Sequence, residues 1–195
     1  MKIILFTGLS ASGKSVISKK VSEKLGLPRI NLHAIIHEIA AQKGFPRARN
    51  WISAVGVEQS LEETRSRLAN LIEEMRNRKG VIVDEVVDPA TLAFLESQFR
   101  EDEFCSVYIR ANRHDRKRFM DKRLGGKDRR EAQREIHFID HLKEEVGIAQ
   151  IIENVDYRFE NFRNVESVAN NIANTLRREV LGTADEFSVK GERGF

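Results

Sequence analysis

Residues 8–15 read Gly-Leu-Ser-Ala-Ser-Gly-Lys-Ser, a short stretch rich in glycine and serine. It fits the pattern G-x-x-x-x-G-K-[ST], in which glycines let the backbone wrap around phosphate groups with its N–H groups pointing inward. A β-rich run at 2–7 precedes it and a helical pattern at 15–25 follows it, which is the context that the motif requires. A helix that begins here also places its positive N-terminal end beside the phosphates.

We therefore expect this loop to bind the phosphates of ATP. GTP is disfavoured because no N-K-x-D sequence occurs in the chain. Lys14 is expected to reach the β- and γ-phosphates and to act in catalysis, and the Ser15 hydroxyl is expected to bind Mg²⁺. A Gly- and Ser-rich turn that matches by chance is the weaker interpretation, given the strand before it and the helix after it. The expected nucleotide contacts are Gly8, Ser10, Ala11, Ser12, Gly13, Lys14 and Ser15.

Short apolar runs alternate with longer amphipathic segments along the rest of the chain. Strands are expected at 2–7, 29–32, 81–84, 104–109 and 157–160. A capping box at 60–63 predicts the start of a helix that ends at Lys79-Gly80, whereas 45–56 has no clear period and is expected to be a loop. Strands separated by helices indicate an α/β fold with a mostly parallel sheet covered on both faces. Ligands then bind beyond the carboxyl ends of the strands.

The run Val-Ile-Val-Asp at 81–84 is an apolar strand that ends in an acid. In a nucleotide-binding protein, Asp84 at this place is expected to be catalytic and to hold Mg²⁺, directly or through water. A strand-terminal Asp that caps the next turn is the structural alternative. Glu85 leaves a further reading open, because a strand that ends Asp-Glu is also typical of ATPases whose Glu activates water.

The segment 108–134 is basic, with 11 Lys or Arg and 4 Asp or Glu, on a chain whose net charge is +3. Two basic helices around Gly125-Gly126 suit a lid, at about 111–147, that closes over a nucleotide and excludes water. Arg116 and Arg123 are two turns apart and share a helix face. We expect Arg116 to bind the nucleotide and Arg123 to act in catalysis. A solvated pair of charged helices is the alternative.

Basic and imidazole side chains follow the second expected strand. His37 is a candidate substrate contact, and its spacing from His33 could suit a metal, but no third ligand is apparent. Arg47 and Arg49, near Trp51, could bind an acceptor phosphate or stack on a base. A plain basic loop is an equal alternative for the two arginines.

These motifs, in this order, resemble P-loop kinases of the nucleoside-monophosphate kinase class, and within it the dephospho-CoA kinases and an archaeal group related to them. The resemblance rests on 8–15, on 81–84, on the basic helix, on 144–148 and on the run VDYRFEN at 155–161. It implies a three-layer fold with a five-stranded parallel sheet flanked by helices, a helical lid, and Mg-ATP-dependent phosphoryl transfer. It also implies that Asn161 and its neighbours line the adenine site.

Two departures fall on the acceptor side. Relatives carry an Asp just after the second strand, whereas 31–37 reads Asn-Leu-His-Ala-Ile-Ile-His and holds no acid. Relatives commonly show Asp-Gly after the third strand, where this chain has Asp84-Glu85. The resemblance therefore supports ATP as the donor but does not identify the acceptor.

The composition suits one globular domain. The chain has 195 residues, of which 41% are hydrophobic, and we expect a single domain at 1–182 with a loose tail at 183–195. No apolar run approaches the length of a membrane span, and that at 3–6 is too short for a secretory signal. Cys105 is the only cysteine, which excludes an intrachain disulfide. We expect a cytoplasmic protein, and the sequence leaves its oligomeric state open.

Three functions follow, in order of preference. The first is an ATP-dependent kinase acting on a nucleotide-like small molecule. The second is a kinase acting on nucleic acid, at a terminus or a modified base, which the basic segment favours. The third is an ATPase or ATP-binding module that needs no acceptor, which Glu85 favours.

Overall fold

A parallel sheet forms the centre of the computed structural model, which describes residues 1–123, 125, 129–162 and 164–182. The strand order is β2-β3-β1-β4-β5, and all pairings between neighbours are parallel. The prediction of a five-stranded parallel sheet is confirmed. The strands are β1 (Lys2–Thr7), β2 (Arg29–Asn31), β3 (Gly80–Asp84), β4 (Glu103–Arg110) and β5 (Tyr157–Glu160).

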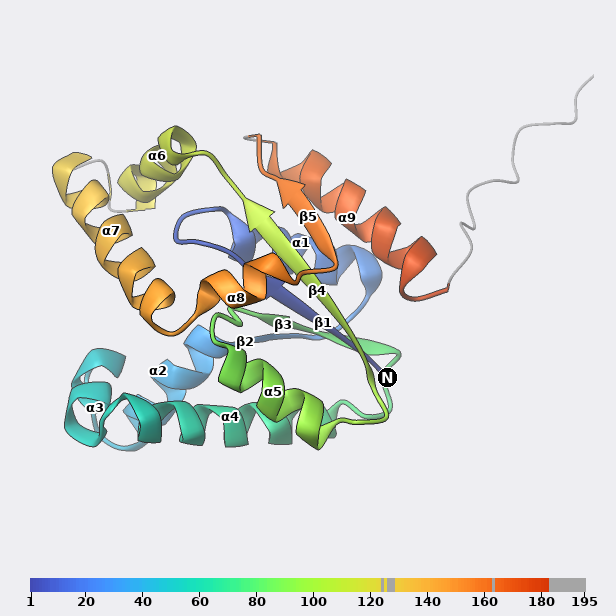
Figure 1. Cartoon of the computed structure of the whole chain (residues 1–195), viewed down its shortest axis with the longest axis horizontal. Coiled ribbons are helices and arrows are strands. Elements are labelled where there is room, and N and C mark those ends of the chain that lie inside the picture. Colours follow the sequence, from blue (N-terminus) through green and yellow to red (C-terminus); the bar gives the residue numbers. More distant parts are fainter. Residues whose placement is uncertain (124, 126–128, 163, 183–195) are drawn as a thin grey trace, which may run out of the picture.

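Helices cover both faces of this sheet and its carboxyl end (Figure 1). One face carries α1 (Lys14–Leu25) and α9 (Val165–Glu179). The other face carries α2 (Leu32–Gln42), α3 (Ala48–Val55), α4 (Val57–Glu74), α5 (Pro89–Gln98) and α8 (Ile148–Glu153). Beyond the carboxyl end of β4 lie α6 (Arg113–Arg123) and α7 (Arg129–Glu145).

The central strand β1 explains why its sequence is an unbroken apolar run. Ile3 and Leu5 pack into the core under α2, α4 and α5, while Ile4 and Phe6 pack under α1 and α9. A strand buried on both faces needs apolar residues at every position. Each such side chain contributes about 1.5–3 kcal/mol through its burial. The sheet therefore holds the loop that follows β1 on a rigid base.

Two local expectations were wrong. The segment 45–56 contains helix α3, because Ala48, Trp51, Ile52 and Val55 follow helical spacing and pack against the core. Two turns are too few for that period to stand out. The capping box at 60–63 does not begin a helix either, since α4 starts at Val57 and Ser60 donates to the Val57 carbonyl at 2.7 Å inside it.

The predicted tail at 183–195 and Gly126 of the predicted hinge lie outside the described residues, so the domain boundaries stay predictions. None of the helices in the described ranges is both long and apolar enough to cross a bilayer.

Candidate functional site

The phosphate-binding loop joins the buried strand β1 to helix α1. Gly13, directly before α1, has φ 85°, and a Cβ there would lie 2.4 Å from Asn161 Nδ2. A Cβ on Gly8 would lie 2.7 Å from the Ile109 carbonyl oxygen. Side chains at these two positions would therefore push the loop away from β4 and the chain after β5. Glycine is therefore required at these positions by the packing of the loop, in addition to allowing phosphates to approach the backbone.

The loop opens into a cavity of about 620 Å³, a volume typical of small-molecule sites. Residues 9–16 form one wall. The end of β2, the end of β3 and the helices α6 and α7 form the others, so the cavity lies at the carboxyl end of the sheet as expected. The side chains that line it include Ser15, His33, Glu85, Met120, Lys122 and Lys143.

Two ammonium groups meet one carboxylate in this cavity. Lys14 and Lys143 each bind one oxygen of Glu85, and the Lys143 contact measures 2.5 Å. Burial by itself raises the pKa of Glu85, but the two ammonium groups outweigh it and bring the pKa to about 2. Burial lowers the pKa of Lys143, and the Lys14 ammonium adds to this effect. The carboxylate is therefore an anion that neutralises part of a positive pocket.

Asp84 lies behind this cavity rather than in it. Its side chain is fully buried, and its Oδ2 accepts from Arg29 and, at 3.0 Å, from Asn31 Nδ2. Arg29 also donates to Ser18 at 2.9 Å, and Ser18 donates to the Ser15 carbonyl at 3.2 Å. A chain of hydrogen bonds thus links the acid to the end of the phosphate-binding loop.

The residues present fit a magnesium ion that is held mainly by nucleotide phosphates. Asp84 Oδ1 is buried and has no hydrogen-bond partner among the described residues, and the Ser15 side chain is exposed at the cavity. Mg²⁺ commonly takes one or two protein oxygens and completes its shell with phosphates and water. The described residues hold no group of three or more His, Cys, Asp or Glu suited to a metal.

Polar side chains from α6 and α7 bind the phosphate-binding loop directly. Arg116 donates to the Ser10 carbonyl at 2.8 Å and pairs with Asp140, which accepts from the Ser10 N–H at 2.9 Å. Lys143 donates to the Gly8 carbonyl at 3.1 Å. The expected lid arginine Arg116 thus holds the loop backbone, and its partner Asp140 was not foreseen from the sequence.

The expected base contact, Asn161, binds the backbone of the phosphate-binding loop. It is buried, donates to the Ser12 carbonyl at 3.0 Å, and its own N–H donates to the Arg110 carbonyl at 2.7 Å. It does not line the cavity. Its adenine role stays a prediction, and its visible role is to fix the loop.

The predicted acceptor residues are not brought together at the cavity. His37, Arg47 and Arg49 are exposed and do not line it, whereas His33 does, with its ring centroid 4.5 Å from that of His37. Trp51 is fully buried and so is unavailable to stack on a base.

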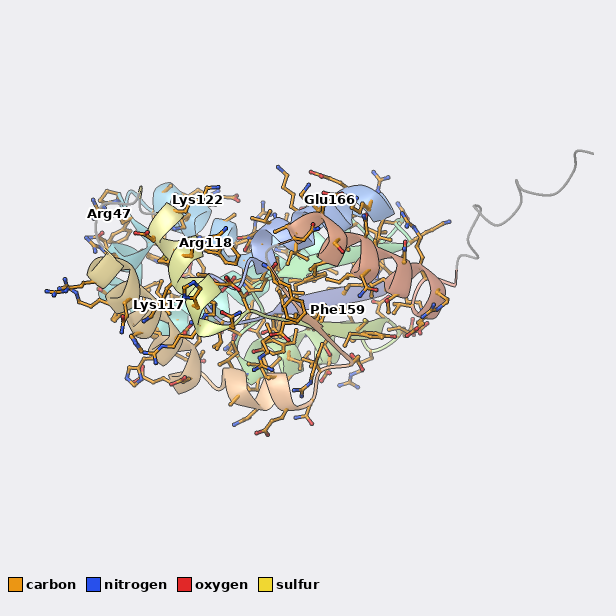
Figure 2. The ribbon with its side chains drawn as sticks, turned by 90° about the horizontal axis from the view of Figure 1, so that it is seen from above. Arg47, Lys117, Arg118, Lys122, Phe159 and Glu166 are labelled. Atoms are coloured by element: carbon orange, nitrogen blue, oxygen red, sulfur yellow. The ribbon has the colours of Figure 1, made fainter. Side chains whose placement is uncertain are left out.

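Several cations lie along α6, of which Arg118 and Lys122 are exposed and Lys117 is partly buried. In Figure 2, Lys117, Arg118 and Lys122 lie together on this helix, and Arg47 lies near them in that view. Figure 1 separates α3, which Arg47 precedes, from α6, so the Arg47 side chain belongs to another part of the surface. Arg123 is the last residue of α6, and its side chain lies outside the described part of the structure.

Sequence reasoning missed Lys143 and Asp140. Their contacts join positions far apart in the chain, such as Gly8 and Lys143, which are 135 residues apart. The available signal was weak: Asp140 and Lys143 are three residues apart on a polar helix and share a face.

The chain is similar in sequence to known proteins. A family model described as AAA domain matches residues 7–143. A UPF0200 protein of Thermococcus sibiricus is 22% identical over 193 residues, which cover 96% of each chain.

Solved kinases share the fold. Shikimate kinase of Aquifex aeolicus superposes with a TM-score of 0.55 at 20% identity, covering 93% of this chain and 99% of that one. The APS kinase of Mycobacterium tuberculosis, solved with AMPPNP and APS, has a TM-score of 0.57 at 18% identity and covers 90% of this chain and 97% of its own. These similarities show the fold of the chain.

Proposed function

The chain belongs to the AAA domain family, and we propose that it is an ATP-dependent phosphotransferase that moves the γ-phosphoryl group of Mg-ATP to a nucleotide-like small molecule. The observation that carries this proposal is the buried Lys14 at a phosphate-binding loop that opens into one cavity of about 620 Å³. Neighbours in fold that are named as shikimate kinase and APS kinase support it.

The chain's own residues divide the work of the reaction. The loop N–H groups and Lys14 hold the β- and γ-phosphates, and Ser15 and Asp84 would hold Mg²⁺, which neutralises charge on the phosphates. The acceptor oxygen forms a bond to the γ-phosphorus and releases any proton that it carries to water, the bond from that phosphorus to its bridging oxygen breaks, and ADP leaves. Positioning and charge stabilisation supply most of the acceleration, because the transition state is loose. We assign Arg123 to this stabilisation from the sequence pattern.

The acceptor site is proposed at the end of the cavity near β2. His33 lines this end, and Asn31 stands where an acid was expected. Asn31 cannot replace that acid as a base, because its amide donates to Asp84 and its carbonyl caps α2 through the Ala34 N–H at 2.9 Å. His37, Arg47 and Arg49 remain candidates for an acceptor that extends beyond the cavity.

Replacing Lys14 by Ala tests the proposal. We expect ADP release, measured against a panel of nucleotides and CoA precursors, to fall by about 10²–10³-fold, because the charge on the transferred phosphate loses its partner. Lys19→Ala, on the exposed side of the same helix, is the matched control and should keep wild-type turnover. Turnover that survives in Lys14→Ala would refute the role of this lysine, and an inactive wild type across the panel would contradict the kinase assignment.

An acceptor-independent ATPase is the second candidate, and the position of Glu85 favours it. This carboxylate lines the cavity and contacts Lys14, so it stands beside the expected γ-phosphate. The candidate predicts steady ATP hydrolysis without any acceptor, abolished by Glu85→Gln. Hydrolysis that is absent until an acceptor is added would exclude it.

A further inference from the structure

Lys143 is a buried cation that reaches the phosphate-binding loop from α7. It is 7% exposed, and its Nζ lies 3.1 Å from the Gly8 carbonyl oxygen and 2.5 Å from Glu85 Oε1. Lys14 binds the other oxygen of the same carboxylate. The two ammonium groups therefore face one shared anionic group from opposite elements of the fold, α1 and α7.

The charges around this carboxylate do not balance. Among the described residues that surround the cavity, Arg116 pairs with Asp140 and Arg29 pairs with Asp84. Glu85 then pairs with both Lys14 and Lys143, so these three side chains together carry one excess positive charge. A buried charge without a full partner is costly, and an anion that enters the pocket removes that cost.

The geometry of Glu85 indicates which anion fits. Its two oxygens each accept from a different ammonium group, as two oxygens of one phosphoryl group would. From this geometry we propose that Lys143 binds the terminal phosphate of the nucleotide together with Lys14, in the place that the Glu85 carboxylate takes in the free protein. This inference rests on the proposed function, since it assumes that the loop binds a nucleoside triphosphate.

A purely structural role for Lys143 makes a different prediction. Its bond to the Gly8 carbonyl would then only hold α7 on the loop. Loss of that bond would weaken the binding of all nucleotides equally, because the conformation of the loop itself would be disturbed. Loss of a contact to the terminal phosphate instead lowers the affinity for a triphosphate and leaves the affinity for a diphosphate unchanged. The ratio of the two affinities therefore separates the two roles.

The experiment is calorimetry of the full chain with AMPPNP and with ADP, each with magnesium. We expect Lys143→Gln, which can still donate a hydrogen bond, to lower AMPPNP affinity by roughly 10- to 100-fold while ADP affinity stays within about 2-fold. Lys143→Arg should keep most of the preference for AMPPNP. Lys79→Gln, exposed just before β3 at the opposite end of the sheet, is the control and should match the wild type.

Each outcome decides the inference. If Lys143→Gln loses affinity for AMPPNP and ADP equally, or for neither, the role proposed for Lys143 is overturned. The proposed function still stands in that case, provided that the wild type binds both nucleotides. A wild type that takes up neither nucleotide would overturn both. Thermal unfolding shows whether each variant is folded; if Lys143→Gln is not, Lys143→Met keeps the side-chain length and carries the same expectation.

Discussion

At the scale of single residues, Glu85 has the least ordinary conformation in the site. Its φ of 79° is uncommon for any residue other than glycine and persists only where the surroundings hold it. Its N–H donates to the Phe6 carbonyl at 3.1 Å, and its carboxylate binds Lys14 and Lys143. In the free protein both the backbone and the carboxylate of Glu85 are therefore held in place, and its charge stabilises two buried lysines.

The lowered pKa of Glu85 predicts a dependence of stability on pH. The pKa is about 2 in the folded chain against 4.5 for the ordinary group, so the folded state favours the ionised form. This contribution is fully present above pH 4.5 and is lost as the pH falls through the folded value. Denaturant titrations of wild type and Glu85→Gln at several pH values should show their difference in unfolding free energy shrink by about 3 kcal/mol over this window. A difference that does not change with pH would contradict the assignment.

The residues of the phosphate-binding loop could be predicted from sequence, whereas its supports could not. The roles of Gly13 and Lys14 follow from a contiguous motif. Lys143 and Asn161 reach the same loop from 135 and 149 residues away, and no local pattern encodes such a distance. Only the packing of the elements brings these side chains together.

At the scale of elements, a small apolar cluster attaches the described side chains of α6 and α7 to the rest of the fold. Their shared cluster consists of Met120 and Ile136 with partly buried Ala11. Polar contacts supply the rest, chiefly those of Arg116 and Asp140 to the phosphate-binding loop. A unit held in this way opens locally at lower free energy than the sheet does.

Hydrogen exchange should show this difference directly. Amides of β1 and β3 should be the slowest, and those of α6 and α7 should exchange faster through local opening. Arg116→Ala leaves Asp140 partly buried without its partner, so exchange in α6 and α7 should accelerate by roughly 100-fold with little change in β1. Arg118→Ala, exposed on the same helix, should leave both rates unchanged. Equal acceleration in β1 would mean that the helices open only with the whole sheet.

The order of the elements could be read from the chain because each strand is a short apolar run and each long helix carries a period. The short helix α3 was missed, since its apolar residues span only 48–55. The start of α4 was placed late because Ser60 and Glu63 imitate a capping box; Glu63 instead pairs with Lys43 at 2.8 Å.

At the scale of the whole molecule, the charge is distributed unevenly. The net charge is +3, yet the segment 108–134 carries 11 Lys or Arg against 4 Asp or Glu. This segment contains α6, which lines the cavity through Met120 and Lys122. The basic segment 108–134 therefore lies beside the cavity, where its positive charge would attract a polyanion such as ATP.

Association of nucleotide should consequently depend on salt. Lys117→Gln combined with Arg118→Gln, both on α6 and outside the cavity lining, should slow the association of AMPPNP several-fold at low ionic strength and leave its dissociation rate nearly unchanged. The effect should fade near 1 M salt, where charges are screened within about 3 Å. Stopped-flow binding measures both rates. Dissociation that changes as much as association would show direct contact rather than steering.

The strand order has a consequence for how the protein is made. β1 precedes its two neighbours in the sheet along the chain and leaves the ribosome well before them, since they begin at Gly80 and Glu103. Asn161, which donates a hydrogen bond to the Ser12 carbonyl, is synthesised later still. β1 is thus synthesised long before its partners, and during that interval this apolar strand is exposed to binding by chaperones.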